Sequence, residues 1–161
     1  MARARRGGNG VLSRPERGRL PGVGSRPAER VVVNRQREVV VRARPMSDFL
    51  SRACDLVLPR AAGVAVCFVT DAEIARLNHA FRGKSGPTDV LSFRGEQRGG
   101  DIAISPATAR RNARKLGRGV HQELRVLILH GVLHLAGYDH ETDTGQMDRR
   151  EQRLRRELGI A

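Results

Sequence analysis

The segment His121–Ala136 constrains the fold most, because its residues are apolar on almost every side of a helix. A helix at the surface of a protein keeps a polar face toward water, whereas a helix that is apolar all round is buried. The segment is too short for a membrane span, which needs about 18 to 20 apolar residues. The other elements must therefore surround this helix, and 161 residues suffice for one domain with a core.

Three histidines lie on this segment and just beyond it. His130 and His134 are four positions apart, so their rings leave the helix on the same side. Gly137 can adopt the left-handed conformation that ends a helix, and the chain can then bring His140 back toward the other two. Three imidazoles without a cysteine or a carboxylate are typical of a catalytic zinc site whose fourth position is open to water.

Two other interpretations compete with a catalytic metal site. A histidine pair on an apolar helix can simply be hydrogen-bonded in the core, but a third histidine after a helix-ending glycine favours a metal. The spacing H-x3-H-x5-H also matches metzincin proteases, in which the residue after the first histidine is the general-base glutamate. Here that residue is Gly131, which disfavours a peptidase. Zn²⁺ is the expected ion, while Ni²⁺, copper and iron also accept imidazole ligands.

The remaining apolar and turn patterns predict an α+β fold, in which a small mixed β-sheet of about four strands packs with four to five helices. Thr70 and Glu73 form a capping box, and Ser105 followed by Pro106 is typical of a helix start. The predicted strands are 31–33, 64–69, 90–93 and 102–104, the last two as a hairpin, while 39–41 either pairs with the first strand or extends away. The predicted helices are about 46–57, 70–80, 106–116, 121–136 and 144–158.

The net charge of +13 favours a polyanionic partner, most simply a nucleic acid. Residues 1–30 contribute +6 of it and are rich in arginine, so we expect a disordered extension or an over-long start, followed by one domain over residues 31–161. The chain has only five aromatic residues, which argues against base stacking as the main mode of binding. The two cysteines form no zinc-thiolate pair, and we expect a reducing, cytoplasmic location without membrane association.

Four segments resemble one known family. The segment His130–His140, HGVLHLAGYDH, is similar to the hallmark of the YbeY family of bacterial metal-dependent endoribonucleases. The other three segments, in matching order and spacing, are DAEIARLN at 71–78, FRGKSGPTDVLSF at 81–93 and GDIAIS at 100–105. Phe81 stands where a tyrosine is more usual in the family. The resemblance covers about residues 31–161 and leaves residues 1–30 outside it.

The resemblance implies a site and an activity. It implies a Zn²⁺-like metal on His130, His134 and His140, and it assigns to Arg82 the family's catalytic arginine. It further implies cleavage of single-stranded RNA, with 16S rRNA 3′-end maturation and ribosome quality control as the process and ribosomal RNA, the ribosome or its small subunit as the partner. Asp89 and two further aspartates, Asp101 and Asp139, receive no catalytic role.

Two alternatives to the endoribonuclease stay open from the sequence. One is a non-catalytic ribosome-assembly factor whose zinc is structural. The other, which Gly131 disfavours, is a metalloprotease-like hydrolase. A fourth protein ligand on the metal would indicate the structural role, because it would close the position that a catalytic site leaves to water.

Overall fold

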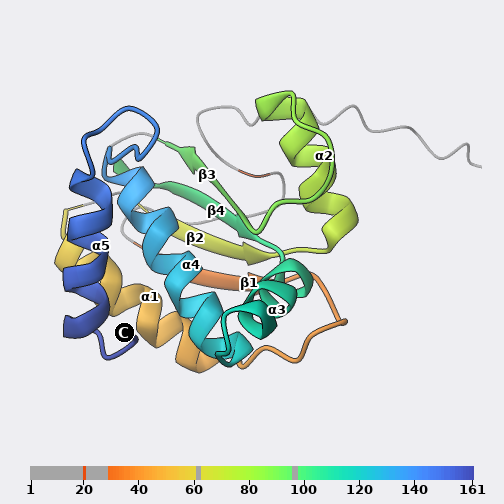
Figure 1. Ribbon diagram of the computed structural model, residues 1–161, viewed down its shortest axis with the longest axis horizontal. Helices are drawn as coiled ribbons and strands as arrows, with labels where there is room; N and C mark the ends of the chain where they lie inside the picture. The colour runs from red at the N-terminus through yellow and green to blue at the C-terminus, as the bar shows by residue number, and fades with distance from the viewer. Residues whose placement is uncertain (1–19, 21–28, 61–62, 96–97) are drawn as a thin grey trace, which may run out of the picture.

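The structure is a computed structural model, and it describes residue 20 and residues 29–60, 63–95 and 98–161. The strands are β1 (Arg30–Asn34), β2 (Val64–Phe68), β3 (Val90–Arg94) and β4 (Gly100–Ile104). The helices are α1 (Ala43–Val57), α2 (Asp71–Arg82), α3 (Pro106–Lys115), α4 (Val120–Leu135) and α5 (Gln146–Glu157). Over these residues, the four strands and five helices follow one another in the order β1, α1, β2, α2, β3, β4, α3, α4, α5 (Figure 1).

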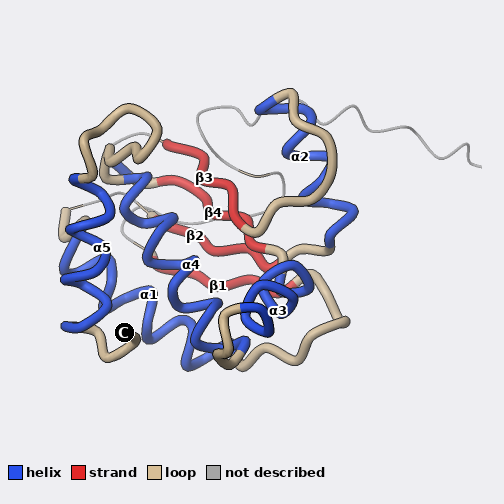
Figure 2. Tube along the Cα trace, viewed as in Figure 1, coloured by secondary structure: helices blue, strands red, loops and turns tan. Residues whose placement is uncertain are grey.

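The strands form one mixed sheet in the order β1-β2-β4-β3. β1, β2 and β4 are parallel, and β3 runs antiparallel to β4. Figure 2 shows the strands as a single layer with α4 lying across it. The predicted α+β architecture, including the hairpin of the last two strands, is therefore confirmed. Within the described part of the chain, β3 is an edge strand: β4 is its neighbour on one side, and no strand lies on the other.

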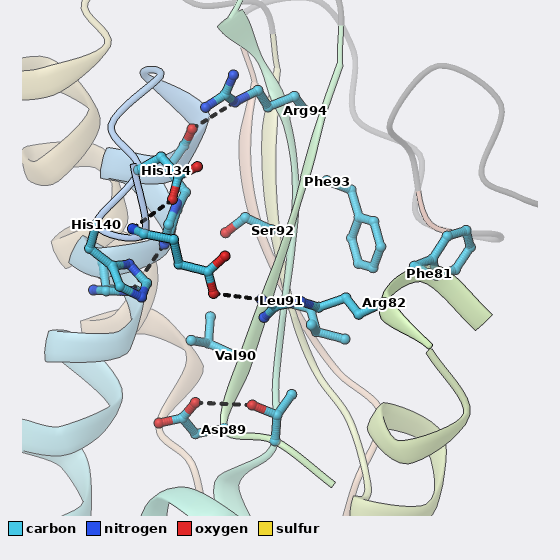
Figure 3. Close-up of a pocket in the computed structure, with 14 residues that line it drawn as sticks. Phe81, Arg82, Asp89, Val90, Leu91, Ser92, Phe93, Arg94, His134 and His140 are labelled. Carbon is cyan, nitrogen blue, oxygen red and sulfur yellow. Dashed lines mark hydrogen bonds and ion pairs between the residues drawn. The ribbon is translucent and has the colours of Figure 1, made fainter. Parts of the chain in front are cut away.

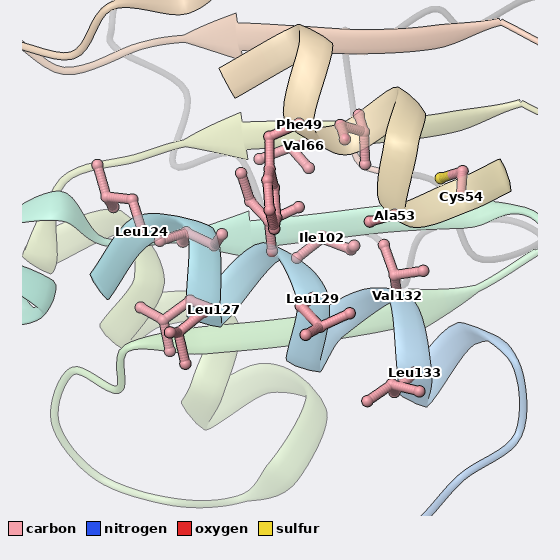
Figure 4. Packing of buried hydrophobic residues seen from close by; sticks show 14 of the residues in the cluster. Phe49, Ala53, Cys54, Val66, Ile102, Leu124, Leu127, Leu129, Val132 and Leu133 are labelled. Atoms are coloured by element: carbon pink, nitrogen blue, oxygen red, sulfur yellow. The ribbon is translucent and has the colours of Figure 1, made fainter. Parts of the chain in front are cut away.

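Each face of the sheet has its own hydrophobic cluster. The larger cluster joins α1, α4 and α5 to one face of the sheet. Figure 4 shows the part of it in which side chains of α1 and α4 meet Val66 of β2 and Ile102 of β4. The smaller cluster packs Ile74 and Leu77 of α2 on the opposite face. Ten of the sixteen residues of α4 are buried, which explains why this helix needs an apolar surface on nearly all sides.

The predicted helix starts are confirmed by their capping bonds. The Thr70 side chain accepts a hydrogen bond from the Glu73 N–H, and Ser105 caps α3 with Pro106 as the first helical residue. α1 begins at Ala43, earlier than expected, with Pro45 in its first turn. A proline is tolerated there because the N–H groups of the first turn have no partner within the helix.

Of the two possibilities for residues 39–41, the structure shows the second: these residues form no strand with β1 and lead away into α1, with Val39 buried. One local prediction was wrong. The apolar spacing of the helix predicts Leu56 on the same inner face as Phe49, Leu50 and Ala53, but Leu56 is 37% exposed. Val57 and Leu58 take the core-facing positions at this end of the helix, so Leu56 turns toward water.

The division of the chain at residue 30 stays a prediction, since residues 1–19 and 21–28 lie outside the described residues. Leu20 is buried in the smaller cluster, and its N–H donates a hydrogen bond to the buried carboxylate of Asp101. Arg30 opens β1 and forms an ion pair with Asp55 at 2.5 Å.

Among the described residues, no helix combines the length and the apolar character that crossing a membrane requires.

Asp71 ties the start of α2 to the start of α3. Its carboxylate accepts hydrogen bonds from Ser105 Oγ at 2.6 Å, Thr108 Oγ1 at 2.7 Å and Arg111 Nη2 at 2.8 Å. Burial would raise the pKa of Asp71, but these hydrogen bonds and the charge of Arg111 outweigh it and hold the pKa below its ordinary value.

Asp71→Asn is expected to lower the free energy of unfolding by about 1–3 kcal/mol at pH 7, because a charged acceptor is lost. The folded-state pKa is depressed, so this contribution is present above the unfolded-state pKa of about 3.9 and disappears as pH falls through the folded-state value. Urea unfolding at pH 7 and in acid, with exposed Asp48→Asn as control, measures it. An equal deficit at both pH values would contradict this account.

Candidate metal site

Two of the three histidines lie one turn apart at the C-terminal end of α4. His130 Nε2 and His134 Nε2 are 3.1 Å apart, and the ring centroids are 4.7 Å apart. The positions i and i+4 share one face of a helix, and this face is turned away from the core, so both rings are only partly buried. The helix that fills the core therefore also presents two neighbouring nitrogen donors at its end.

The turn after α4 brings the third histidine to the same place. Gly137 has φ +102°, and its N–H donates to the His134 carbonyl at 3.0 Å. The Tyr138 N–H donates to the Leu133 carbonyl at 3.1 Å, which completes a Schellman motif. The chain reverses there, and the His140 ring centroid lies 5.3 Å from that of His134. Gly137 thus has the helix-ending role that the sequence predicted.

The three histidines could hold one metal ion. One nitrogen from each ring lies within 4.8 Å of the others, and within the described residues no further cysteine, aspartate or glutamate joins this group. Tetrahedral Zn²⁺ with bonds of about 2.0–2.1 Å places its ligand nitrogens about 3.3 Å apart, close to the His130–His134 spacing. Burial and the neighbouring His130 and His140 lower the pKa of His134, which favours the neutral ring that a metal requires.

A buried carboxylate on α5 holds the first of these rings. Glu151 is 6% exposed, and its Oε2 lies 2.9 Å from His130 Nδ1. Because a carboxylate can only accept, Nδ1 carries the proton and Nε2 of the neutral ring is left as the donor atom for a metal. Arg155 Nε donates to the other carboxylate oxygen at 3.1 Å. Burial would raise the pKa of Glu151, but His130 and Arg155 together hold it below its ordinary value.

Sequence reasoning missed Glu151, although a signal was present. The apolar spacing of the last helix predicts that Met147 and Leu154 face inward. Position 151 lies on the same face, four residues after Met147 and three before Leu154. A glutamate on the buried side of a helix needs a partner. What the sequence could not supply was the identity of that partner on α4.

Arg82, the last residue of α2, lies in the same cleft as the three histidines. The cleft has a volume of about 580 Å³ and also takes in β3 and the loop after α4. Figure 3 shows the Arg82 side chain reaching across β3 toward this loop, where its Nη2 lies 3.2 Å from Glu141 Oε1. Both side chains are exposed, at 40% and 58%, so the ion pair is a weak one.

Two side chains of β3 fasten the strand to the end of α4. Ser92 Oγ donates to the Gly131 carbonyl at 3.3 Å, and Arg94 Nε donates to the His134 carbonyl at 2.9 Å. The His134 carbonyl belongs to the last turn of α4, where the negative end of the helix dipole makes the cationic side chain of Arg94 favourable. The Gly131 carbonyl lies one turn earlier on the same helix. Sequence reasoning did not anticipate these bonds, because they join elements 40 residues apart.

The aspartates without an assigned role occupy different surroundings. Asp139 Oδ1 accepts the Glu141 N–H at 3.0 Å, which stabilises the loop that carries His140. Asp89 lines the cleft at the start of β3. Asp101 is fully buried in β4, away from the cleft.

Gly131 faces the sheet rather than the cleft. A Cβ at this position would lie 2.7 Å from Ile102 Cγ2 and 2.9 Å from Ile102 Cδ1, closer than real Cβ contacts come. A glutamate here would therefore need the buried Ile102 side chain or α4 itself to shift. The packing of this fold thus disfavours a side chain at the position that holds the general base in metzincins.

Known proteins share this fold and sequence. The family model described as Endoribonuclease YbeY matches residues 32–159. The protein named Endoribonuclease YbeY from Solibacter usitatus is 44% identical over 118 residues, covering 73% of this chain and 80% of that relative. Its namesake from Koribacter versatilis is 42% identical over 136 residues, covering 81% and 86%. The solution structure of TM1509 from Thermotoga maritima matches with a TM-score of 0.56 and 28% identity, covering 80% and 87% of the two chains. The resemblance seen in the four sequence segments is thus confirmed, and this chain belongs to the YbeY family.

Proposed function

We propose that this chain is a metal-dependent endoribonuclease that cleaves single-stranded RNA in ribosomal RNA processing. The observation that carries the proposal is the joint presence of three histidine ligands and Arg82 in one cleft of a YbeY-family fold. The proposed enzyme acts in the maturation of the 16S rRNA 3′ end and in ribosome quality control. Its proposed partner is the ribosome or the small ribosomal subunit in the cytoplasm. The surplus of positive charge supports a polyanionic substrate.

His130, His134 and His140 hold the ion, with Zn²⁺ preferred and Ni²⁺ an alternative. These three neutral ligands would leave the charge of a bound Zn²⁺ uncompensated, and such an ion would supply Lewis-acid chemistry and an activated water to phosphodiester cleavage. The chain contributes the rigidity of the site. α4 fixes two rings, the turn at Gly137 fixes the third, and Glu151 fixes the tautomer of His130.

Arg82 binds the phosphate of the scissile nucleotide. A guanidinium presents paired donors that match two phosphate oxygens, and it stabilises the negative charge that grows during phosphoryl transfer. Its present partner is the carboxylate of Glu141, an exposed pair worth about 1 kcal/mol or less. A phosphate can therefore replace Glu141 at little cost, so we assign Glu141 the role of an exchangeable partner.

The two alternatives have less support. A structural zinc would need a fourth ligand, and the described residues supply a group of three. A peptidase of the metzincin kind would need a base at position 131, which is a glycine packed against the Ile102 side chain. We therefore favour an open, catalytic metal site.

Removal of the metal tests the proposed function. Protein stripped with a chelator and then reloaded with Zn²⁺ or Ni²⁺ is incubated with single-stranded rRNA fragments, with duplex RNA and with casein. We expect cleavage of the single strand only, and only by loaded protein, visible as fragments on a denaturing gel. Cleavage by stripped protein would contradict metal dependence. Binding without cleavage would favour the assembly factor, and degraded casein the protease.

Arg82→Ala is expected to lower kcat/KM for RNA by about 10²–10³-fold, the usual loss when one group that stabilises the transition state is removed. Metal content and melting temperature should stay unchanged, because the side chain is exposed and weakly paired. Arg76→Ala, an exposed arginine on the same helix, is the matched control. If Arg82→Ala lost metal or stability instead, the arginine would be structural.

A further inference from the structure

The free edge of β3 forms the floor of the cleft. All five residues of the strand, Val90–Arg94, line the same cleft as the three histidines. β4 occupies one side of β3, and no other described strand occupies the opposite side. Figure 3 views this open edge directly, with the histidines on one side of the strand and Phe81 and Phe93 on the other.

The register of the hairpin shows which backbone groups point into the cleft. The Asp89 carbonyl and the Gly95 N–H, one residue beyond either end of β3, both form hydrogen bonds with the β4 side of the hairpin. Pairing alternates along an antiparallel ladder, so the N–H and C=O of Val90, Ser92 and Arg94 point away from β4. The edge therefore offers a donor and an acceptor about every 6.8 Å.

The two walls of the cleft differ in chemistry. On one side, Ser92 and Arg94 lean toward α4, next to the three histidines. On the other side, the rings of Phe81 and Phe93 meet edge to face, with centroids 5.1 Å apart. Both phenylalanines are partly exposed, so two of the few aromatic residues of the chain are available in the cleft.

We propose that the free edge of β3 binds the sugar-phosphate backbone of one RNA strand, with a base against Phe81 and Phe93 and the phosphates toward the histidines. This inference rests on the proposed function and deepens it. The outward N–H groups suit phosphate oxygens, and the outward carbonyls suit the 2′-hydroxyls that distinguish RNA from DNA. A single edge accommodates one extended strand, which agrees with single-stranded rather than duplex RNA.

The unlike walls favour a nucleotide strand over a peptide. An open strand edge is also where an extended peptide can add to a sheet. A peptide, however, sends its side chains alternately to both sides, whereas a nucleotide strand can keep bases on one side and phosphates on the other. Arg82 lies next to Phe81 in the chain, so one helix end provides a phosphate ligand beside a surface for a base.

Proline at position 92 tests the edge. Ser92→Pro removes an outward N–H without removing a hydrogen bond of the sheet, and edge strands tolerate such a proline. Ser92→Ala keeps this N–H and is the matched reference, since both variants lose the hydroxyl. Binding of a fluorescent single-stranded RNA to the full chain, with chelator present to prevent cleavage, is measured by anisotropy. We expect Ser92→Pro to bind about tenfold more weakly than Ser92→Ala.

Two further comparisons test the aromatic wall of the cleft and the recognition of the ribose 2′-hydroxyl. Phe81→Leu should weaken binding about tenfold for RNA, and much less for an oligonucleotide with an abasic site at the stacked position. The deoxy version of the oligonucleotide should bind the unmodified protein more weakly than the RNA does. Melting temperatures verify folding. If Ser92→Pro unfolds, Val90→Pro replaces it, because Val90 is the first residue of the strand and its backbone N–H also points away from β4.

Equal RNA binding by folded Ser92→Pro and Ser92→Ala would overturn the proposal, as would displacement of the RNA by an extended peptide. These outcomes are separate from the proposed function. If the metal-loaded protein cleaves RNA while the β3 variants bind RNA normally, the edge is not the binding surface, and the proposed nuclease activity is still supported. If the variants bind RNA as expected but the metal-loaded protein cleaves none, the proposed RNA-binding edge is supported and the proposed nuclease activity is contradicted.

Discussion

His134→Ala removes metal and RNA cleavage together, and its effect is expected to exceed that of any other single substitution proposed for this chain. Two imidazoles remain, and the site loses the ring whose Nε2 lies 3.1 Å from the Nε2 of His130. Loss of the Lewis acid removes several kcal/mol of transition-state stabilisation, or about 10³-fold or more in rate.

Elemental analysis and a cleavage assay on the same preparation measure this result. His79→Ala, an exposed histidine on α2, serves as the control and should keep both metal and activity. Alanine is a good helix former, and the His134 ring is only partly buried, so α4 should stay folded. A metal-free His134→Ala protein that still cleaves RNA would refute the mechanism.

Glu151→Gln is expected to weaken metal binding by about 10–100-fold while leaving the three histidines in place. The amide oxygen can still accept from His130 Nδ1, but the charge that holds the ring and strengthens its Nε2 as a donor is gone. Glu151→Ala should cost more, since the Arg155 side chain then loses its buried partner.

Competition with a chromogenic chelator gives the metal dissociation constant of each variant without relying on catalysis. Glu157→Gln, an exposed glutamate on the same helix, is the matched control. An unchanged dissociation constant for Glu151→Gln, together with a lowered melting temperature, would make Glu151 a purely structural residue of α5.

Local patterns predicted most elements, because they depend on neighbours in the chain. The helix starts at Thr70 and Ser105 follow from terminal N–H groups that a nearby side chain must satisfy, and the helix end at Gly137 follows from terminal carbonyls that a turn at a glycine satisfies. The histidine cluster was predictable for the same reason, since two of its members lie on one helix and the third follows a single turn.

The features that were missed depend on elements far apart in the sequence. Glu151 reaches His130 from another helix, and Arg94 reaches the end of α4 across 40 residues. Arg82 came from the family resemblance, because composition alone cannot distinguish one arginine from 27 others. Similarly, the strand order that leaves β3 at the edge follows from the packing of both sheet faces, which no single segment encodes.

The close packing of Gly131 against Ile102 also limits how this scaffold can evolve. An acid beside the first ligand, the change that would supply the base of a metzincin, requires the Ile102 side chain or the helix to shift at the same time. A single substitution at position 131 therefore carries a packing cost before it offers any new chemistry.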